Sequence, residues 1–173
     1  VRERETGTME QIIVTPIRPA QLILGKLIPY AMIGLLETIL VLAVTLLWFE
    51  VPLRGSLALL VALAILFMLN AQGIGLLVST ISHTQQQAMM TAVFFVILPM
   101  MLLSGFAFPI ENMPAPVQYV TYLLPLRYFL VILRGIFLKG VGWEVLWPQV
   151  AALAGFGAGI LWLAVLRFQK RLK

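Results

Sequence analysis

Long apolar stretches divide the chain into segments that are each long enough to cross a membrane. A transmembrane helix needs about 20 consecutive apolar residues. We predict such spans at 27–49, 55–81, 88–108 and 145–166, and only the first contains a charged residue, Glu37. None of the four stretches alternates apolar and polar residues as the strands of a membrane barrel do. The pattern therefore predicts an all-α integral membrane protein with a single transmembrane domain.

A further apolar stretch, 117–138, is interrupted by Pro125, Arg127 and Arg134. An arginine at the bilayer centre costs about 2.5–3.5 kcal/mol even on the most lenient insertion scale. Several prolines break the chain just before this stretch, which suits a turn back into the membrane. Segment 109–140 is therefore predicted to be a re-entrant or interfacial helical element on the outer side of the membrane. The alternative is a fifth span.

Basic residues are distributed unevenly between the two membrane sides that four spans define. The side with both ends of the chain carries Arg2, Arg4, Arg18, Lys26, Arg167, Lys170, Arg171 and Lys173. The other side carries Arg54, Arg127, Arg134 and Lys139. Because the side richer in Lys and Arg stays cytoplasmic, both ends are predicted to be cytoplasmic. A fifth span would move the basic tail outside and remove this asymmetry.

The first segment, 1–19, is too short and too polar to span a membrane. Met9, Ile12 and Ile13 have the spacing of one helical face, and Pro16 and Pro19 end this short helix and begin the next. The segment is therefore predicted to be an amphipathic helix that lies along the cytoplasmic membrane surface. From the residues alone it is either an interfacial anchor or a docking helix for a cytoplasmic partner.

Composition supports the membrane assignment. The chain has 173 residues, of which 61% are hydrophobic and 11% charged, whereas soluble domains carry about 25% charged residues. Its net charge of +5 lies mainly near the ends, unlike the basic face of a nucleic-acid-binding domain. Cysteine is absent, and a single histidine, His83, cannot form a metal site alone. Because position 1 is valine and no signal-peptide pattern follows, we expect a fragment of a longer protein.

Polar residues inside the spans are the candidate binding groups. An intramembrane carboxylate such as Glu37 indicates a functional role by default, and it could bind a cationic substrate, pair with Arg127 or Arg134, or stay protonated. The more ordinary alternative is a satisfied hydrogen bond between helices. Asn70 and Gln72 are typical either of hydrogen bonds between helices or of a substrate pathway. Gly155 and Gly159 form a small-residue motif that favours close helix packing, within the chain or between two copies.

The sequence contains no complete phosphate-binding loop. Gly25-Lys26 looks like part of a phosphate-binding loop, but Ala20 and Leu27 occupy the positions where that loop needs glycine and a hydroxyl residue. ATP is therefore not expected to bind this chain by that route, and no cofactor of its own is predicted.

Two longer stretches carry a resemblance to a known family. The stretch ERETGTMEQIIVTPIRPAQLILGKL resembles the coupling-helix region of type-2 ABC exporter permeases. The stretch LLSGFAFPIENMPAPVQYVTYLLPLRYFLVILRGIFLKG resembles the outer re-entrant region of the same family, where it includes Pro125, Arg127, Tyr128 and Arg134. The two occur in the family's order and spacing, so the resemblance covers nearly the whole chain. It implies that the four spans are the third to sixth of a six-span permease in the cytoplasmic membrane of a bacterium.

The resemblance also implies partners and a mechanism. A second permease copy or a homologue would complete the pathway, ATP-binding subunits would hold ATP and Mg²⁺, and a periplasmic adaptor protein and membrane lipids are further expected partners. Glu3, Arg4 and Glu5 would contact the ATPase, and Gly7 would either allow close approach or break the helix. The chain itself would not be an enzyme. It would export a small molecule, such as a drug, lipid or ion, by alternating access.

Two other classes of function remain as alternatives. A proton-coupled secondary transporter could use Glu37, but such transporters show internal repeats that we do not find. A membrane-embedded lipid enzyme would need paired carboxylates, a histidine cluster or a nucleophile with its base, which one histidine and no cysteine disfavour. A neighbouring reading frame for a P-loop ATPase would separate the exporter from the secondary transporter.

Overall fold

The computed structural model of the chain describes residue 1 and residues 19–169. The predicted coupling helix therefore lies outside the described residues, except at its two ends. The described elements, in chain order, are α3 (Pro19–Leu47), α4 (Leu57–Ile81), α5 (Gln85–Ala92), the π-helical segment η1 (Val93–Ile97), α6 (Leu98–Leu103), the 3-10 turn η2 (Ile110–Asn112), α7 (Ala115–Thr121), α8 (Pro125–Arg134), the π-helical segment η3 (Gly135–Lys139) and α9 (Trp143–Gln169). All of them are helical.

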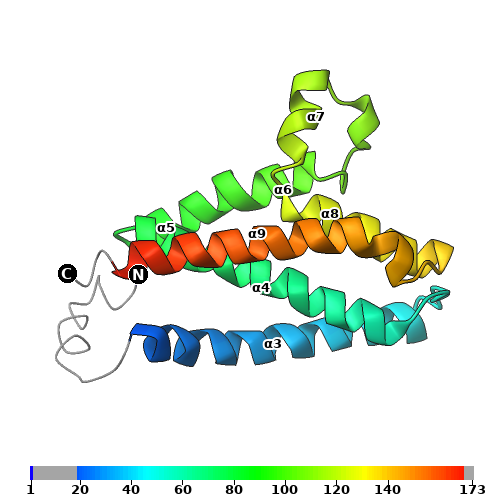
Figure 1. Ribbon diagram of the computed structural model, residues 1–173, viewed down its shortest axis with the longest axis horizontal. Coiled ribbons are helices and arrows are strands. Elements are labelled where there is room, and N and C mark those ends of the chain that lie inside the picture. The colour runs from blue at the N-terminus through cyan, green and yellow to red at the C-terminus, as the bar shows by residue number, and fades with distance from the viewer. Residues whose placement is uncertain (2–18, 170–173) are drawn as a thin grey trace.

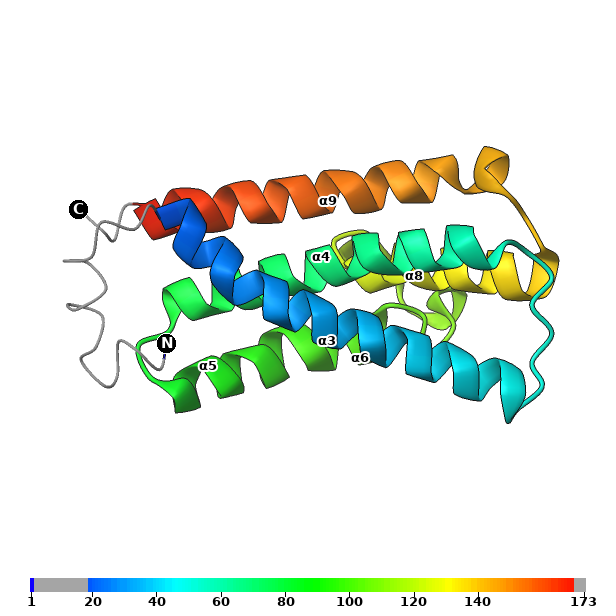
Figure 2. The ribbon, with the colours of Figure 1, turned by 90° about the horizontal axis from the view of Figure 1, so that it is seen from below.

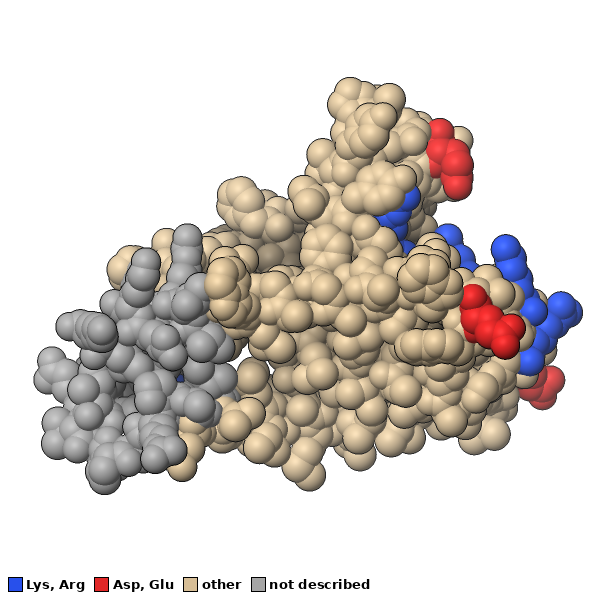
Figure 3. Space-filling view, in the orientation of Figure 1, with Lys and Arg blue, Asp and Glu red and all other residues tan. Residues whose placement is uncertain are grey.

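Four helical segments are long and apolar enough to cross a membrane, which confirms the predicted number of spans. They are Leu24–Leu47, Leu57–Ile81, Gln85–Leu103 and Trp143–Ala164. Consecutive spans run in opposite directions, so α3 begins and α9 ends at the same end of the bundle (Figures 1 and 2). The charged side chains visible in Figure 3 gather at the opposite end and beside α7, and the face between is free of them. This arrangement fits a bilayer around the middle of the bundle.

The third span ends earlier than we predicted. The prediction placed its end at Phe108, but α6 ends at Leu103, and Ser104 donates its backbone N–H to the Met100 carbonyl at 3.3 Å. Gly105 follows with φ +87°, a left-handed conformation that glycine adopts without strain. The apolar run continues past this turn, so hydrophobicity alone could not reveal the end of the helix.

Packing is densest between α4, α8 and α9. Their buried side chains, together with two from η3, form one hydrophobic core, consisting of Leu60, Leu63, Ile132, Ile136, Phe137, Leu146, Val150 and Leu153. Phe67 of α4 also stacks on Phe129 of α8, with ring centroids 4.5 Å apart. By contrast, no side chain described on α3, α5 or α6 is buried. These helices leave broad apolar faces uncovered, which lipid or further protein must cover in the membrane.

Asn70 links α4 to α9 across this core. It is fully buried, and its Nδ2 donates to the Leu66 carbonyl at 2.9 Å and to the Leu153 carbonyl of α9 at 3.1 Å. Gly157 of α9 allows the approach, because a Cβ on that residue would lie 3.1 Å from Asn70 Nδ2. The structure thus confirms the hydrogen bond between helices that we considered for Asn70.

Gly155 and Gly159 do not pack closely within the chain, which was one of the two alternatives for this motif. A Cβ on either residue would meet no described atom within 4 Å. Close packing occurs instead at Gly157, which lies between them on the buried face. The sequence motif did not reveal which face of α9 points toward α4.

Replacing Asn70 with alanine should destabilise the bundle. The change removes both hydrogen bonds and leaves the Leu153 carbonyl without this donor, which we expect to cost about 0.6–2 kcal/mol by comparison with polar contacts in other membrane helices. The measurement is thermal unfolding of the purified protein in detergent. Leu69→Ala is the matched control, since Leu69 is 41% exposed on the same helix. Equal stability of the Asn70 variant and the wild type would contradict a linking role for Asn70.

Candidate functional site

The re-entrant element is a bent pair of helices at the outer end of the bundle. α7 and the continuous α8–η3 segment meet at 84°, as in a re-entrant loop or a broken span, which agrees with the predicted re-entrant element and excludes a straight fifth span. α7 projects sideways from the bundle, and α8 lies along α4 and α9 (Figure 1). Pro125 is buried at the first position of α8, where the missing N–H of proline costs no hydrogen bond. The proline therefore starts α8 directly after the bend.

Arg127 connects α8 to α7. Its Nη1 donates to the Thr121 hydroxyl and to the Gln118 carbonyl, the latter at 3.4 Å. Its guanidinium also lies over the Tyr122 ring, 3.7 Å from the centroid, where a cation–π interaction is favourable. Thr121 is fully buried, so part of this arginine lies inside the protein. Arg127 thereby fixes the angle between the two helices.

Arg134 lies two turns further along α8 and reaches a different neighbour. Its Nη2 donates to the carbonyl of Gly105, just after α6, at 2.9 Å. Gly105 has a positive φ, and Ile110 packs 3.2 Å from where a Cβ would stand. The arginine therefore holds the tight turn after the third span against the re-entrant element.

Tyr128 anchors the element to α9. Its hydroxyl donates to the Tyr122 carbonyl at 2.9 Å, and its ring lies against Phe156 of α9, with centroids 5.8 Å apart. Three of the residues that the sequence singled out in this region, Pro125, Arg127 and Tyr128, thus lie at the bend between α7 and α8, and Arg134 lies at the other end of α8.

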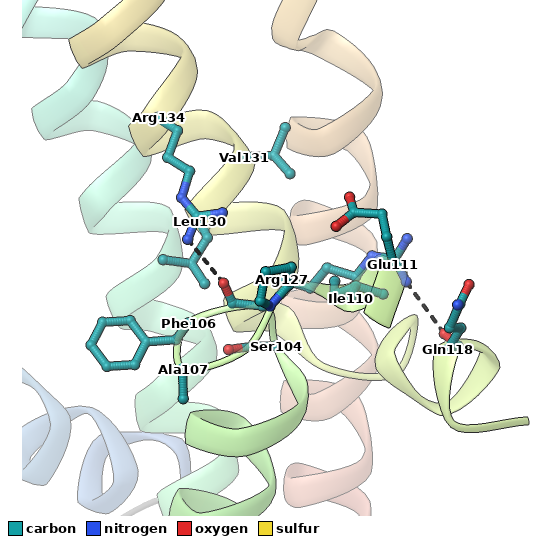
Figure 4. Close-up of a pocket in the computed structure, with 12 residues that line it drawn as sticks. Ser104, Phe106, Ala107, Ile110, Glu111, Gln118, Arg127, Leu130, Val131 and Arg134 are labelled. Atoms are coloured by element: carbon teal, nitrogen blue, oxygen red, sulfur yellow. Dashed lines mark hydrogen bonds between the residues drawn. The ribbon is translucent and has the colours of Figure 1, made fainter. Parts of the chain in front are cut away.

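A cavity of about 540 Å³ opens between the end of α6, η2, α7 and α8 (Figure 4). Arg127, Arg134 and Glu111 are the charged residues that line it. The other lining residues are Ser104, Gly105, Phe106, Ala107, Pro109, Ile110, Gln118, Leu130 and Val131. The Ser104 hydroxyl is buried beside it without a hydrogen-bond partner. This is a polar cavity at the edge of an apolar bundle.

Glu37 lies near the middle of the first span and does not form the pair that we considered. Its side chain is exposed on α3. Arg127 and Arg134 instead donate to neutral oxygen atoms, so of the alternatives for Glu37 the pairing with these arginines does not occur in the described part of the chain. α3 packs mainly on α4, which keeps Glu37 away from α8. The sequence alone does not determine which direction this face of α3 points.

Gln72 lines a second cavity, of about 460 Å³, between α3 and α4. Lys26, Tyr30, Met68, Ala71, Gly75 and Leu76 are among its other lining residues. The Nε2 atom of Gln72 is buried without a hydrogen-bond partner. Asn70, only two positions away, faces α9 instead. The structure therefore separates two amides that the sequence grouped together.

One contact near the outer end was not anticipated. The loop between α3 and α4 binds η3, because the backbone N–H and Nη1 of Arg54 donate to the Phe137 and Leu138 carbonyls, each at 3.3 Å. Gly140 faces the Arg54 backbone, which lies 3.0 Å from where a Cβ would stand. Gly55, which follows Arg54 in the sequence, was the signal that could have indicated a close approach between this loop and η3.

The four residues predicted to contact an ATPase, Glu3, Arg4, Glu5 and Gly7, lie outside the described residues. Their assignment stays a prediction from the sequence.

Comparison with known proteins gives one consistent result. The profile of a family described as "ABC-2 family transporter protein" matches residues 1–166. The chain is 41% identical to a protein named as a probable multidrug ABC transporter permease, YbhS, of Escherichia coli K12, over 99% of this chain and 45% of that protein. It is 33% identical to the inner membrane transport permease YhhJ of the same organism, over 98% of this chain and 46% of that protein.

More distant similarity extends to a eukaryote. ABC transporter G family member 20 of Dictyostelium discoideum is 22% identical over 99% of this chain and 24% of its own length. The chain thus spans less than half of the curated relatives that it matches. No solved structure matches. The spans and these similarities together identify a multi-pass integral membrane protein.

Proposed function

This chain belongs to the ABC-2 family of transporters, and on that premise we propose that it forms part of the permease of an ATP-driven exporter in a bacterial inner membrane. The observation that carries the proposal is the single family match over residues 1–166, which takes in the segment before α3, all four spans and the re-entrant pair. Relatives named as multidrug permeases favour a small drug-like cargo. Lipids and ions are the other candidate cargoes.

The proposed partners follow from the parts of the transport cycle that this chain would need. A separate ATP-binding subunit supplies ATP and Mg²⁺ and pushes on segment 1–19, through Glu3, Arg4, Glu5 and Gly7. A second permease copy or a homologue covers some of the apolar surface that α3, α5 and α6 leave uncovered. A periplasmic adaptor is a further proposed partner. Alternating access then moves the cargo past Glu37 and Gln72 to the outer end, where the re-entrant pair lies.

The decisive test uses the full-length protein. It is purified with its ATP-binding partner, reconstituted in vesicles and screened for compounds that stimulate ATP hydrolysis and accumulate inside inverted vesicles. We expect stimulation and accumulation to depend on ATP and to survive collapse of the proton gradient. Accumulation that follows the gradient and ignores ATP would instead support a proton-coupled transporter that uses Glu37.

Glu37→Gln should change cargo preference and leave the fold intact. Because Glu37 forms no hydrogen bond or ion pair with a described residue, the substitution removes no polar interaction within this part of the chain. Removing an intramembrane negative charge should weaken stimulation of ATP hydrolysis by cationic compounds about tenfold relative to neutral ones, a difference of about 1.4 kcal/mol. Glu50→Gln, an exposed carboxylate beyond the end of α3, serves as the control. Equal responses to cationic and neutral compounds would rule out a role for Glu37 in substrate binding.

A further inference from the structure

The cavity between α6, η2, α7 and α8 contains two arginines, neither of which forms an ion pair with a described carboxylate. All the hydrogen bonds of Arg127 and Arg134 go to neutral oxygen atoms, namely one hydroxyl and two backbone carbonyls. Glu111 also lines the cavity but forms no ion pair with either arginine. Arg127 is half-buried and Arg134 is exposed, so both guanidinium groups are accessible to a ligand from outside the chain. The cavity therefore offers cationic donors to an anionic ligand.

The two arginines retain most of their hydrogen-bonding capacity. A guanidinium group has five N–H donors. The structure accounts for two hydrogen bonds at Arg127 and one at Arg134. The residues are spaced by two helical turns, so both project from the same face of α8. Arg134 extends toward the loop with Phe106 and Ala107, whereas Arg127 extends toward Gln118 (Figure 4). A ligand in the cavity would thus meet free donors on two sides.

Exposed apolar side chains line the cavity and lie on the segments next to it. Phe106 and Val131 line it and are 60% and 46% exposed. Outside the lining, Phe108 of the loop after α6, Tyr119 of α7 and Leu123 just after α7 are 58%, 75% and 68% exposed. A free anion would gain nothing from these side chains. A molecule with an anionic head and hydrocarbon tails would contact both the arginines and this apolar surface.

We propose that this cavity binds the phosphodiester head group of a membrane phospholipid, with Arg127 and Arg134 as its cationic ligands. Arginine suits this role because its planar fork of donors matches the geometry of phosphate oxygens. Two arginines and Glu111 leave the cavity with one net positive charge, which balances one phosphodiester. The Glu111 carboxylate repels the phosphate. The hydroxyl or ammonium group of the lipid head group would therefore lie next to Glu111. The bound lipid would brace α7 against α6, independently of whether the protein exports anything.

The test measures lipid binding by the full-length protein in detergent, with native mass spectrometry and thermal unfolding as readouts. The probes are phosphatidylglycerol, a phosphate-free galactosyl diacylglycerol with the same acyl chains, and inorganic phosphate. We expect phosphatidylglycerol to bind and to raise the unfolding temperature, as a ligand specific for the folded state must. Arg127→Gln combined with Arg134→Gln should weaken its binding about tenfold or more, because charge-assisted contacts to phosphate are lost.

Controls separate binding from folding. Lys139→Gln removes a positive charge from η3, outside the cavity lining, and should leave phosphatidylglycerol binding unchanged. If the double variant misfolds, Arg134→Lys keeps the charge and loses the fork of donors, and it should still weaken binding. Equal binding of the galactosyl lipid, or an equal loss in Lys139→Gln, would overturn the proposal. Inorganic phosphate that binds as tightly as the lipid would also overturn it, by identifying a free anion as the ligand.

Discussion

Replacing Gly55 with valine should lower the stability of the outer end of the bundle by about 1–3 kcal/mol, as overpacking of a dense core does. A Cβ at this position would lie 2.9 Å from both the carbonyl oxygen and Cγ2 of Ile136. Ile136 of η3 is fully buried in the core that η3 shares with α4, α8 and α9, so it cannot move aside without disturbing its neighbours. The loop must move instead, and the hydrogen bonds from Arg54 to Phe137 and Leu138 are then strained or lost.

Thermal unfolding in detergent measures this effect, and a second glycine provides the control. Gly55→Ala should destabilise the protein for the same steric reason, though less than valine. Gly155→Ala should have the opposite sign, because no described atom lies within 4 Å of its Cβ position and alanine favours a helix by about 0.8–1.0 kcal/mol over glycine. If both alanine variants were stabilised, the close contact between the α3–α4 loop and η3 would be refuted.

Exchanging the charges of Glu3 and Arg4, by Glu3→Lys and Arg4→Glu together, should reduce export about tenfold or more. Charge-assisted hydrogen bonds to a partner contribute about 1.5–3 kcal/mol each, and reversal replaces them with repulsion. The ATP-binding subunit should still hydrolyse ATP, since its catalytic site is in another chain. Export and hydrolysis are measured in the same vesicles, so that uncoupling is seen directly as hydrolysis without transport.

Membrane insertion of this charge-exchange variant must be checked first. The check is whether the membrane fraction contains as much of the variant as of the wild type. Gln86→Lys is the matched control, because it changes one charge at an exposed position in the first turn of α5, on the same side of the membrane. Its export should equal that of the wild type. Wild-type export by the Glu3 and Arg4 variant would show that these residues do not transmit force from a motor.

The sequence predicted the number of spans and the re-entrant element because both depend on composition along a short stretch. A run of some 20 apolar residues is stable only where it is removed from water, in lipid or in a protein core. Arg127 and Arg134, behind several prolines, made a plain span unfavourable, and the bend of 84° agrees with that interpretation. These features are local, so a single sequence contains them.

The incorrect predictions concern features that depend on neighbours in space. The end of the third span is set by the positive φ of Gly105, which the arginine of a later helix helps to hold. The choice of Gly157 over Gly155 depends on which face of α9 meets Asn70. Likewise, Glu37 and the two arginines share an attraction in principle, but α3 packs on α4 and is kept away from α8. Such relations need the tertiary structure.

The π-helical segment Val93–Ile97 inside the third span has a practical consequence for scanning experiments. At its end the Leu98 N–H bonds to the Val93 carbonyl, five residues back, and Pro99 follows directly. An extra residue in one turn rotates every later side chain by about 100° relative to a regular α-helix. A single helical wheel drawn through the whole span would therefore assign Met100 and its successors to the wrong side. Labelling data should be indexed separately before and after this segment.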